Sequence, residues 1–113
     1  MFDPSSGGLA PQQIATLERF LRAGFRFVTF ERYSRYIAVE KDGFVALLDP
    51  AGGTFALFGQ AGYVMGDGIG MLVERPEGKV FLHHSQSLAA TAELLVAYAE
   101  FKREVAALLS PKE

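Results

Sequence analysis

The stretch from Phe25 to His84 is the feature that most constrains how this chain can fold. Short apolar runs alternate there with turns rich in glycine, and a helical pattern lies on either side. Six segments are predicted as strands because they are short, rich in aromatic and β-branched residues, and bounded by Gly, Pro and Asp. They are residues 25–30, 33–41, 44–48, 54–58, 69–75 and 79–84. We therefore predict an α+β fold, a single antiparallel β-meander of five to six strands flanked by an N-terminal and a C-terminal helix; the lower count applies if 25–30 belongs to a loop.

Glycine and proline divide this stretch into hairpins. Asp42-Gly43 is the strongest turn signal, because a type I′ turn needs positive φ at both central positions. Residues 49–53 and 76–78 predict two further turns. Residues 59–70 contain five glycines, so we interpret them as a loop rather than as a strand.

The predicted first helix covers about residues 11–23. Pro11 suits the first helical position, where its missing N–H costs nothing. Ile14, Leu17 and Leu21 recur at spacings of three and four and define one apolar face. Gly24 then provides a stop signal.

The predicted last helix is capped by Ser85 or Ser87 and runs to about Leu109, where Ser110-Pro111 ends it. It carries an apolar stripe about five turns long. The members of the stripe are Thr91, Leu94, Tyr98, Phe101, Val105 and Leu108. This spacing is typical of a helix that packs across a sheet, and it also fits the a and d positions of a helix–helix dimer seam over nearly three heptads.

Composition limits the classes of protein to consider. The length of 113 residues indicates one domain, which we place at 11–113 after a flexible tail at 1–10. The absence of cysteine excludes disulfides and thiolate metal sites. The first residues lack the basic and apolar regions of a signal peptide, and no apolar run is long enough to span a membrane, so we expect a cytoplasmic protein without a membrane partner.

Charge is distributed unevenly along the chain. Residues 19–41 hold six basic and two acidic groups, while the whole chain has a net charge of −2. Nucleic-acid-binding domains are usually basic throughout. We therefore expect no nucleic-acid partner.

The strands at 44–48 and 54–58 are apolar on both faces. A sheet with one solvated face would alternate between apolar and polar residues. We therefore expect both faces to be covered, either by one helix on each face or by a second copy of the protein.

Candidate reactive residues are few. His83 and His84 are adjacent at the end of the last predicted strand, and adjacent strand residues point to opposite faces, so they do not predict a metal site. The glycines of 59–70 match neither a P-loop nor a dinucleotide-binding fingerprint. We assign no catalytic residue and expect neither a metal nor a cofactor.

Three functional hypotheses remain. The first is a non-enzymatic protein-interaction module that forms a homodimer. Its interface would use the stripe on the last helix, namely Leu94, Tyr98, Phe101, Val105 and Leu108.

The second hypothesis is a small-molecule-binding domain with a pocket between the sheet and the last helix, closed by residues 59–70. Tyr63, Asp67, His83 and Tyr98 would supply the polar contacts. The third is a small enzyme that uses His83 or His84, with Asp67 as the orienting carboxylate.

Overall fold

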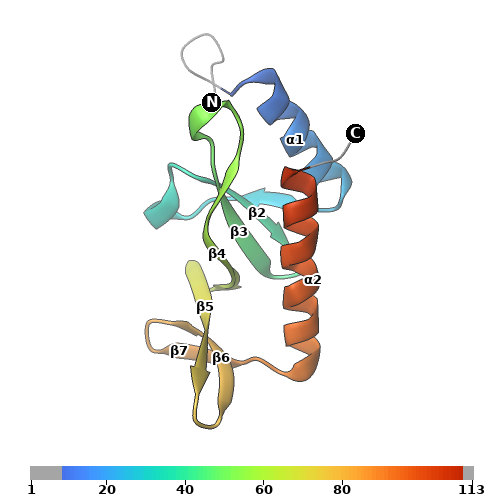
Figure 1. Ribbon diagram of the computed structural model, residues 1–113. Helices are drawn as coiled ribbons and strands as arrows, with labels where there is room; N and C mark the ends of the chain where they lie inside the picture. Colours follow the sequence, from blue (N-terminus) through green and yellow to red (C-terminus); the bar gives the residue numbers. More distant parts are fainter. Residues whose placement is uncertain (1–8, 111–113) are drawn as a thin grey trace.

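A computed structural model describes residues 9–110 and shows, within that range, two helices joined by an antiparallel meander (Figure 1). The elements are α1 (Pro11–Arg22), β1 (Arg26–Val28), β2 (Ile37–Lys41), β3 (Phe44–Asp49), β4 (Ala56–Met65), β5 (Gly68–Arg75), β6 (Gly78–His83), β7 (Gln86–Ala89) and α2 (Ala92–Leu109). Two single 3₁₀ turns, η2 (Glu31–Tyr33) and η3 (Ala51–Gly53), lie in the connections. The seven strands pair in chain order and the sheet does not close. The predicted α+β meander between two helices is confirmed.

The number of strands differs from the expected five to six. The additional strand, β7, lies where Ser85 or Ser87 was expected to cap the last helix. The chain turns back at residues 84–85, because His83 pairs with Gln86. The side chain of Thr91 caps α2 instead, and it accepts a hydrogen bond of 3.2 Å from the Leu94 N–H.

The predicted ends of the two helices agree closely with the structure. Helix α1 begins at Pro11 and ends at Arg22, and α2 ends at Leu109 as expected. The Asp42-Gly43 turn is also confirmed, with φ of 56° and 92° at its two residues. Residues 1–8 of the predicted tail, and Pro111 of the predicted stop signal, lie outside the described residues.

The N-terminus of α1 is joined to the turn between β3 and β4 by one buried side chain. The Gln13 amide oxygen accepts from the Ala10 N–H at 2.7 Å, and its NH₂ donates to the Pro50 and Thr54 carbonyls at 2.7 and 2.9 Å. A single amide therefore satisfies three backbone groups and positions α1 against the sheet.

The interpretation of residues 59–70 as a loop is wrong. Residues 59–65 form the end of β4 and residues 68–70 the start of β5, in register from Tyr63 opposite Gly70 to Met65 opposite Gly68, and only Gly66 and Asp67 form the turn between them. The glycines allow close packing: a Cβ on Gly62 would stand 2.5 Å from Cγ2 of Ile69 and 2.6 Å from the Gly70 carbonyl oxygen. Glycine in a strand interior often marks such a close approach.

Strand β4 is bent by a bulge. Val45 of β3 pairs with Gly62 and Leu47 pairs with Phe58, so three residues of β4, 59–61, lie opposite Ala46 alone. Gly59 adopts a φ of 65°, which glycine tolerates without a steric cost. The bulge separates the part of β4 that continues along β3 from the part that pairs with β5.

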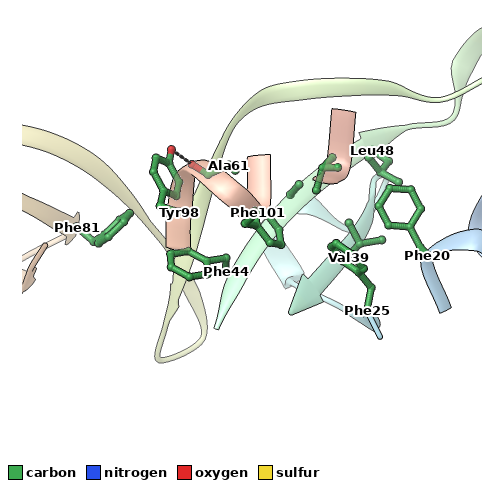
Figure 2. Close-up of a cluster of buried hydrophobic side chains, with 11 residues drawn as sticks. Phe20, Phe25, Val39, Phe44, Leu48, Ala61, Phe81, Tyr98 and Phe101 are labelled. Carbon is green, nitrogen blue, oxygen red and sulfur yellow. Dashed lines mark hydrogen bonds between the residues drawn. The ribbon is translucent and has the colours of Figure 1, made fainter. Parts of the chain in front are cut away.

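Both helices lie on one face of the sheet, where they enclose the main core (Figures 1 and 2). Its buried residues are Phe20, Phe25, Val39, Phe44, Ala46, Leu48, Ala61, Phe81, Tyr98, Phe101 and Val105. On the other face, Ala38, Val45 and Leu47 are buried beneath Phe30 of the β1–β2 connection, and Tyr33 and Tyr36 of the same connection pack against them. Both faces of β3 are therefore covered as expected, but by this connection rather than by a second helix or a second copy. For residues 54–58 the same expectation is wrong, because Leu57 and Phe58 of β4 are 45% and 41% exposed.

The meander divides after Gly70. Strand β5 pairs with β4 only over Gly68–Gly70 and then with β6 from Met71 onward. Strands β5–β7 consequently form a three-stranded unit at the end of the molecule opposite α1 (Figure 1). The molecule is elongated, with extents of 51 × 32 × 21 Å.

Candidate functional site

The three-stranded β5–β7 unit has one apolar face that lies outside both core clusters and borders the 3₁₀ turn η2 at one end. Met71 pairs with Leu82, Val73 pairs with Val80, and Val80 pairs with Ala89, so these five side chains share one face. We call this set the outer face. None of its members belongs to either core cluster, and each is half-buried or exposed.

The opposite face of the same unit is used in the main core. Leu72 packs there and Phe81 is fully buried, with ring centroids 5.3 Å from Tyr98 and 5.6 Å from Tyr63. The unit is thus anchored by one face while its outer face meets solvent. Contiguous apolar surface of this kind is characteristic of interaction sites, whereas single exposed apolar residues are ordinary.

A signal for the outer face was present in the sequence. Met71-Leu72-Val73 and Val80-Phe81-Leu82 are apolar at consecutive positions, which means apolar on both faces of a strand. The same pattern in β3 was correctly interpreted as two-sided coverage. In β5 and β6 one face packs in the main core, whereas on the other face Ile69 alone packs in the second cluster among the described residues.

A cavity of about 530 Å³ lies between η2 and the β5–β6 strands. It is lined by Glu31, Arg32, Tyr33, Asp67, Gly68, Ile69, Met71, Leu82, His83 and His84. Asp67, His83 and His84, which the enzyme hypothesis names, therefore line the same cavity. The ligand-binding hypothesis named Asp67 and His83 but placed its pocket between the sheet and the last helix, away from this cavity. The wall combines two acids and one guanidinium with two imidazoles, so it offers both donors and acceptors.

The two histidines are held by the backbone around them. His84 occupies the turn between β6 and β7 with a φ of 55°, and its ring centroid lies 4.3 Å from that of His83. The His83 ring lies against Gly68, where a Cβ would overlap it. Among the described residues, Asp67 makes no side-chain hydrogen bond to either imidazole, and no group of three or more His, Asp or Glu residues is placed to hold a metal ion.

Tyr98 lies apart from this cavity, in the aromatic part of the main core (Figure 2). Tyr63 packs against the same core. The Tyr98 hydroxyl donates to the carbonyl oxygen of Ala61 at 2.7 Å, within the β4 bulge. Burial raises the pKa of the Tyr98 phenol above its usual value of 10.0. Of the four predicted ligand-binding residues, Asp67 and His83 therefore share a cavity, whereas Tyr63 and Tyr98 do not line it.

A second cavity of about 270 Å³ lies between α2 and β4, in the region where the ligand-binding hypothesis predicts a pocket. It is lined by Ala46, Leu57, Gly59, Gln60, Ala61, Lys102 and Val105. None of the four predicted ligand-binding residues is among them. Residues 59–61 form part of its wall, but as a strand bulge.

The stripe on α2 packs against the sheet of its own chain. Tyr98, Phe101 and Val105 are buried, and Leu94 and Leu108 are half-buried against the same core. A partner would reach the three buried residues only if α2 left the sheet. The most exposed large apolar residue of α2 is Val96, which is 61% exposed.

Comparison of the chain with known protein families, curated proteins and solved structures finds no match. No helix within residues 9–110 is long and apolar enough to cross a membrane.

Proposed function

We propose that this chain is a non-enzymatic protein-interaction module that self-associates as a homodimer through its β5–β7 end. The outer face is the observation that carries the proposal. Covering apolar surface is favourable by about 2.5 kcal/mol for every 100 Å² removed from water. A partner that covers this end gains that free energy without any rearrangement of the core.

Other exposed apolar residues support docking at this end less directly. Leu88 of β7 and Met71 of β5 are each 37% exposed and both belong to the β5–β7 unit. Ile14 and Leu21 on α1, and Val96 on α2, lie on other elements of the molecule. Phe27 on β1, and Leu57 and Phe58 on β4, are also exposed. Within the described residues, β1 and β7 are the two edge strands, and β1 is the shorter, with three residues.

Sedimentation velocity over a range of protein concentrations tests self-association, and hydrogen–deuterium exchange locates it. We expect a dimer at about 10–100 μM, the affinity range of modest protein interfaces. Amide exchange in β5–β7 should slow as the dimer forms, while exchange in α1 serves as the internal control and stays constant. A monomer throughout this range would refute the proposal, as would protection confined to α1 or α2.

We propose small-molecule binding as the second candidate, because Asp67, His83 and His84 converge with Arg32 on one cavity. Its volume lies within the range usual for small-molecule sites. A thermal-shift screen with polar metabolites tests this candidate. A ligand should raise Tm for the wild type and for Gln60→Ala, which alters the other cavity, but not for Asp67→Asn combined with His83→Gln. The absence of any shift in the screen would count against it.

A further inference from the structure

The pairing of β7 with β6 determines which backbone groups of β7 remain unused. The Ala90 N–H donates to the Lys79 carbonyl at 2.9 Å, and Val80 lies opposite Ala89. In an antiparallel pair, hydrogen-bonded and non-hydrogen-bonded positions alternate. The N–H and C=O groups of Gln86 and Leu88 therefore point to β6. Those of Ser87 and Ala89 point outward from the edge of the sheet.

The two edges of the sheet differ in how they are protected. Strand β1 has three residues, and its Arg26 forms an ion pair with Glu40 at 2.8 Å. Strand β7 has no charged residue and no proline, and all four of its residues are exposed. Charge and proline are the usual means by which proteins prevent an edge strand from pairing with another chain. At β7 neither is present.

We infer that a second copy of this chain pairs with β7 antiparallel, with the two-fold axis at Leu88. The inference rests on the proposed self-association and specifies how the two edges meet. The outer faces of the two copies then lie side by side on one face of the joined sheet, where edge pairing by itself leaves them uncovered. Ser87 of each copy then lies opposite the partner's Ala89, and all outward N–H and C=O groups of these residues find hydrogen-bond partners. Leu88 lies opposite the partner's Leu88 in a non-hydrogen-bonded position, where Cα atoms are about 4.5 Å apart.

The edge of β7 is self-complementary, which favours a second copy over an unrelated strand. Its two outward residues, Ser87 and Ala89, lie one on each side of Leu88. A two-fold axis through Leu88 therefore places the N–H donors of one copy opposite the C=O acceptors of the other. The same register directs the His83–His84 end of one copy toward the start of α2 in the other. Glu93 is the exposed acid in that first turn, so imidazole and carboxylate approach each other.

Cysteine cross-linking tests this register directly, because the native chain has no cysteine. Leu88→Cys places two thiols across the axis at a Cα separation that a disulfide accepts. We expect mild oxidation to convert most of this variant into a covalent dimer at about 10 μM, a concentration at which an interface of modest affinity is populated. Val96→Cys, on the exposed side of α2, is the matched control and should remain largely uncross-linked.

A proline substitution tests the hydrogen bonds. Ala89→Pro removes an outward N–H that β6 does not use, so the monomer fold should persist by circular dichroism while the dissociation constant rises at least tenfold. If Ala89→Pro fails to fold, Ser87→Lys tests the same edge by adding a charge to each copy. Both variants should shift the sedimentation profile toward monomer.

The outcomes separate this inference from the function on which it rests. A wild-type dimer in which Leu88→Cys does not cross-link, or in which Ala89→Pro or Ser87→Lys leaves the affinity unchanged, would overturn edge pairing. The proposed function would stand in that case, with contact between two outer faces as the remaining arrangement. A wild-type chain that is monomeric at about 100 μM would overturn both, since an interface weaker than that has little affinity.

Discussion

The hydrogen bond from Tyr98 to the β4 bulge is a sharp test of how α2 is held on the sheet. The hydroxyl of Tyr98 donates to the Ala61 carbonyl at 2.7 Å, and both residues are almost completely buried. Residues 59–61 interrupt the ladder between β3 and β4. Replacing Tyr98 by Phe keeps the aromatic ring and removes only the donor.

The expected loss of stability in Tyr98→Phe follows from the Ala61 carbonyl, which loses its hydrogen-bond donor. A buried carbonyl that loses its partner costs about 1–3 kcal/mol. We expect Tyr98→Phe to lower the free energy of unfolding by about 2 kcal/mol, which corresponds to a fall in Tm of several degrees for a domain of this size. Urea denaturation followed by circular dichroism measures the change in free energy, and an unchanged m-value would show that the folded state remains equally compact.

Tyr63→Phe is the matched control. Tyr63 lies in the same aromatic cluster, with its ring centroid 5.1 Å from Phe44, and its hydroxyl makes no side-chain hydrogen bond within the described residues. It should change stability by less than about 0.5 kcal/mol, as substitutions that remove no buried partner usually do. Equal effects of Tyr98→Phe and Tyr63→Phe would refute the assignment of stability to the Tyr98 hydrogen bond.

The pH dependence gives an independent check of the same site. Because burial raises the pKa of Tyr98 above 10.0, the folded protein favours the neutral phenol. The associated stability is complete below pH 10.0 and is lost as the pH rises through the folded-state pKa. Wild type should therefore lose more unfolding free energy than Tyr98→Phe between about pH 9 and pH 11. Parallel losses in the two proteins would contradict burial of an ionisable group at this position.

Three further substitutions test other parts of the structure. Gln13→Glu replaces the NH₂ that donates to two carbonyls by a carboxylate that repels them, and should cost about 3 kcal/mol of unfolding free energy in urea titrations. Gly68→Ala should lower Tm, because the Cβ of the new alanine would overlap the His83 ring. Adding His83→Ala to this variant should restore part of the lost Tm. Additive effects of the two substitutions would show that the two residues do not touch. Phe81→Ala should cost about 3–5 kcal/mol and speed amide exchange more in β5–β7 than in β2–β3, whereas uniform acceleration would contradict its role as the anchor of that unit.

The elements that sequence patterns predicted well are those whose cause is local. Pro11, the apolar spacing in both helices and the Asp42-Gly43 turn each depend on residues within a few positions along the chain. Helix 92–109 was predicted with its correct end but an early start, because Ser85 and Ser87 resemble caps as well as Thr91 does. Ser85, Ser87 and Thr91 are all acceptable N-cap residues by local preference. The pairing of β7 with β6 places Ser85 in a turn and Ser87 in a strand, so only Thr91 can cap α2.

Residues 59–70 show where local patterns fail. Judged from neighbouring residues in the sequence, glycine indicates a turn. Here glycine is required because side chains of the neighbouring strands occupy the space that a Cβ would fill. Ile69 occupies the space where a Cβ on Gly62 would be, and His83 does the same for Gly68. Such crowding arises from pairing between strands, so it is invisible in a reading of the sequence alone.

The candidate sites depend on tertiary structure even more strongly. Local sequence patterns predict the α+β meander between two helices, the apolar character of β3 on both faces, and the few polar residues that could form a site. Only the folded chain decided that the β1–β2 connection covers the second face of β3 and that β5–β7 diverge with their outer face in solvent. It also decided that Asp67 and His83 line one cavity while Tyr98 is buried in the core. The physical reason is that the spacing of apolar residues indicates which side chains are buried. The residues that bury each of them are determined by the path of the whole chain.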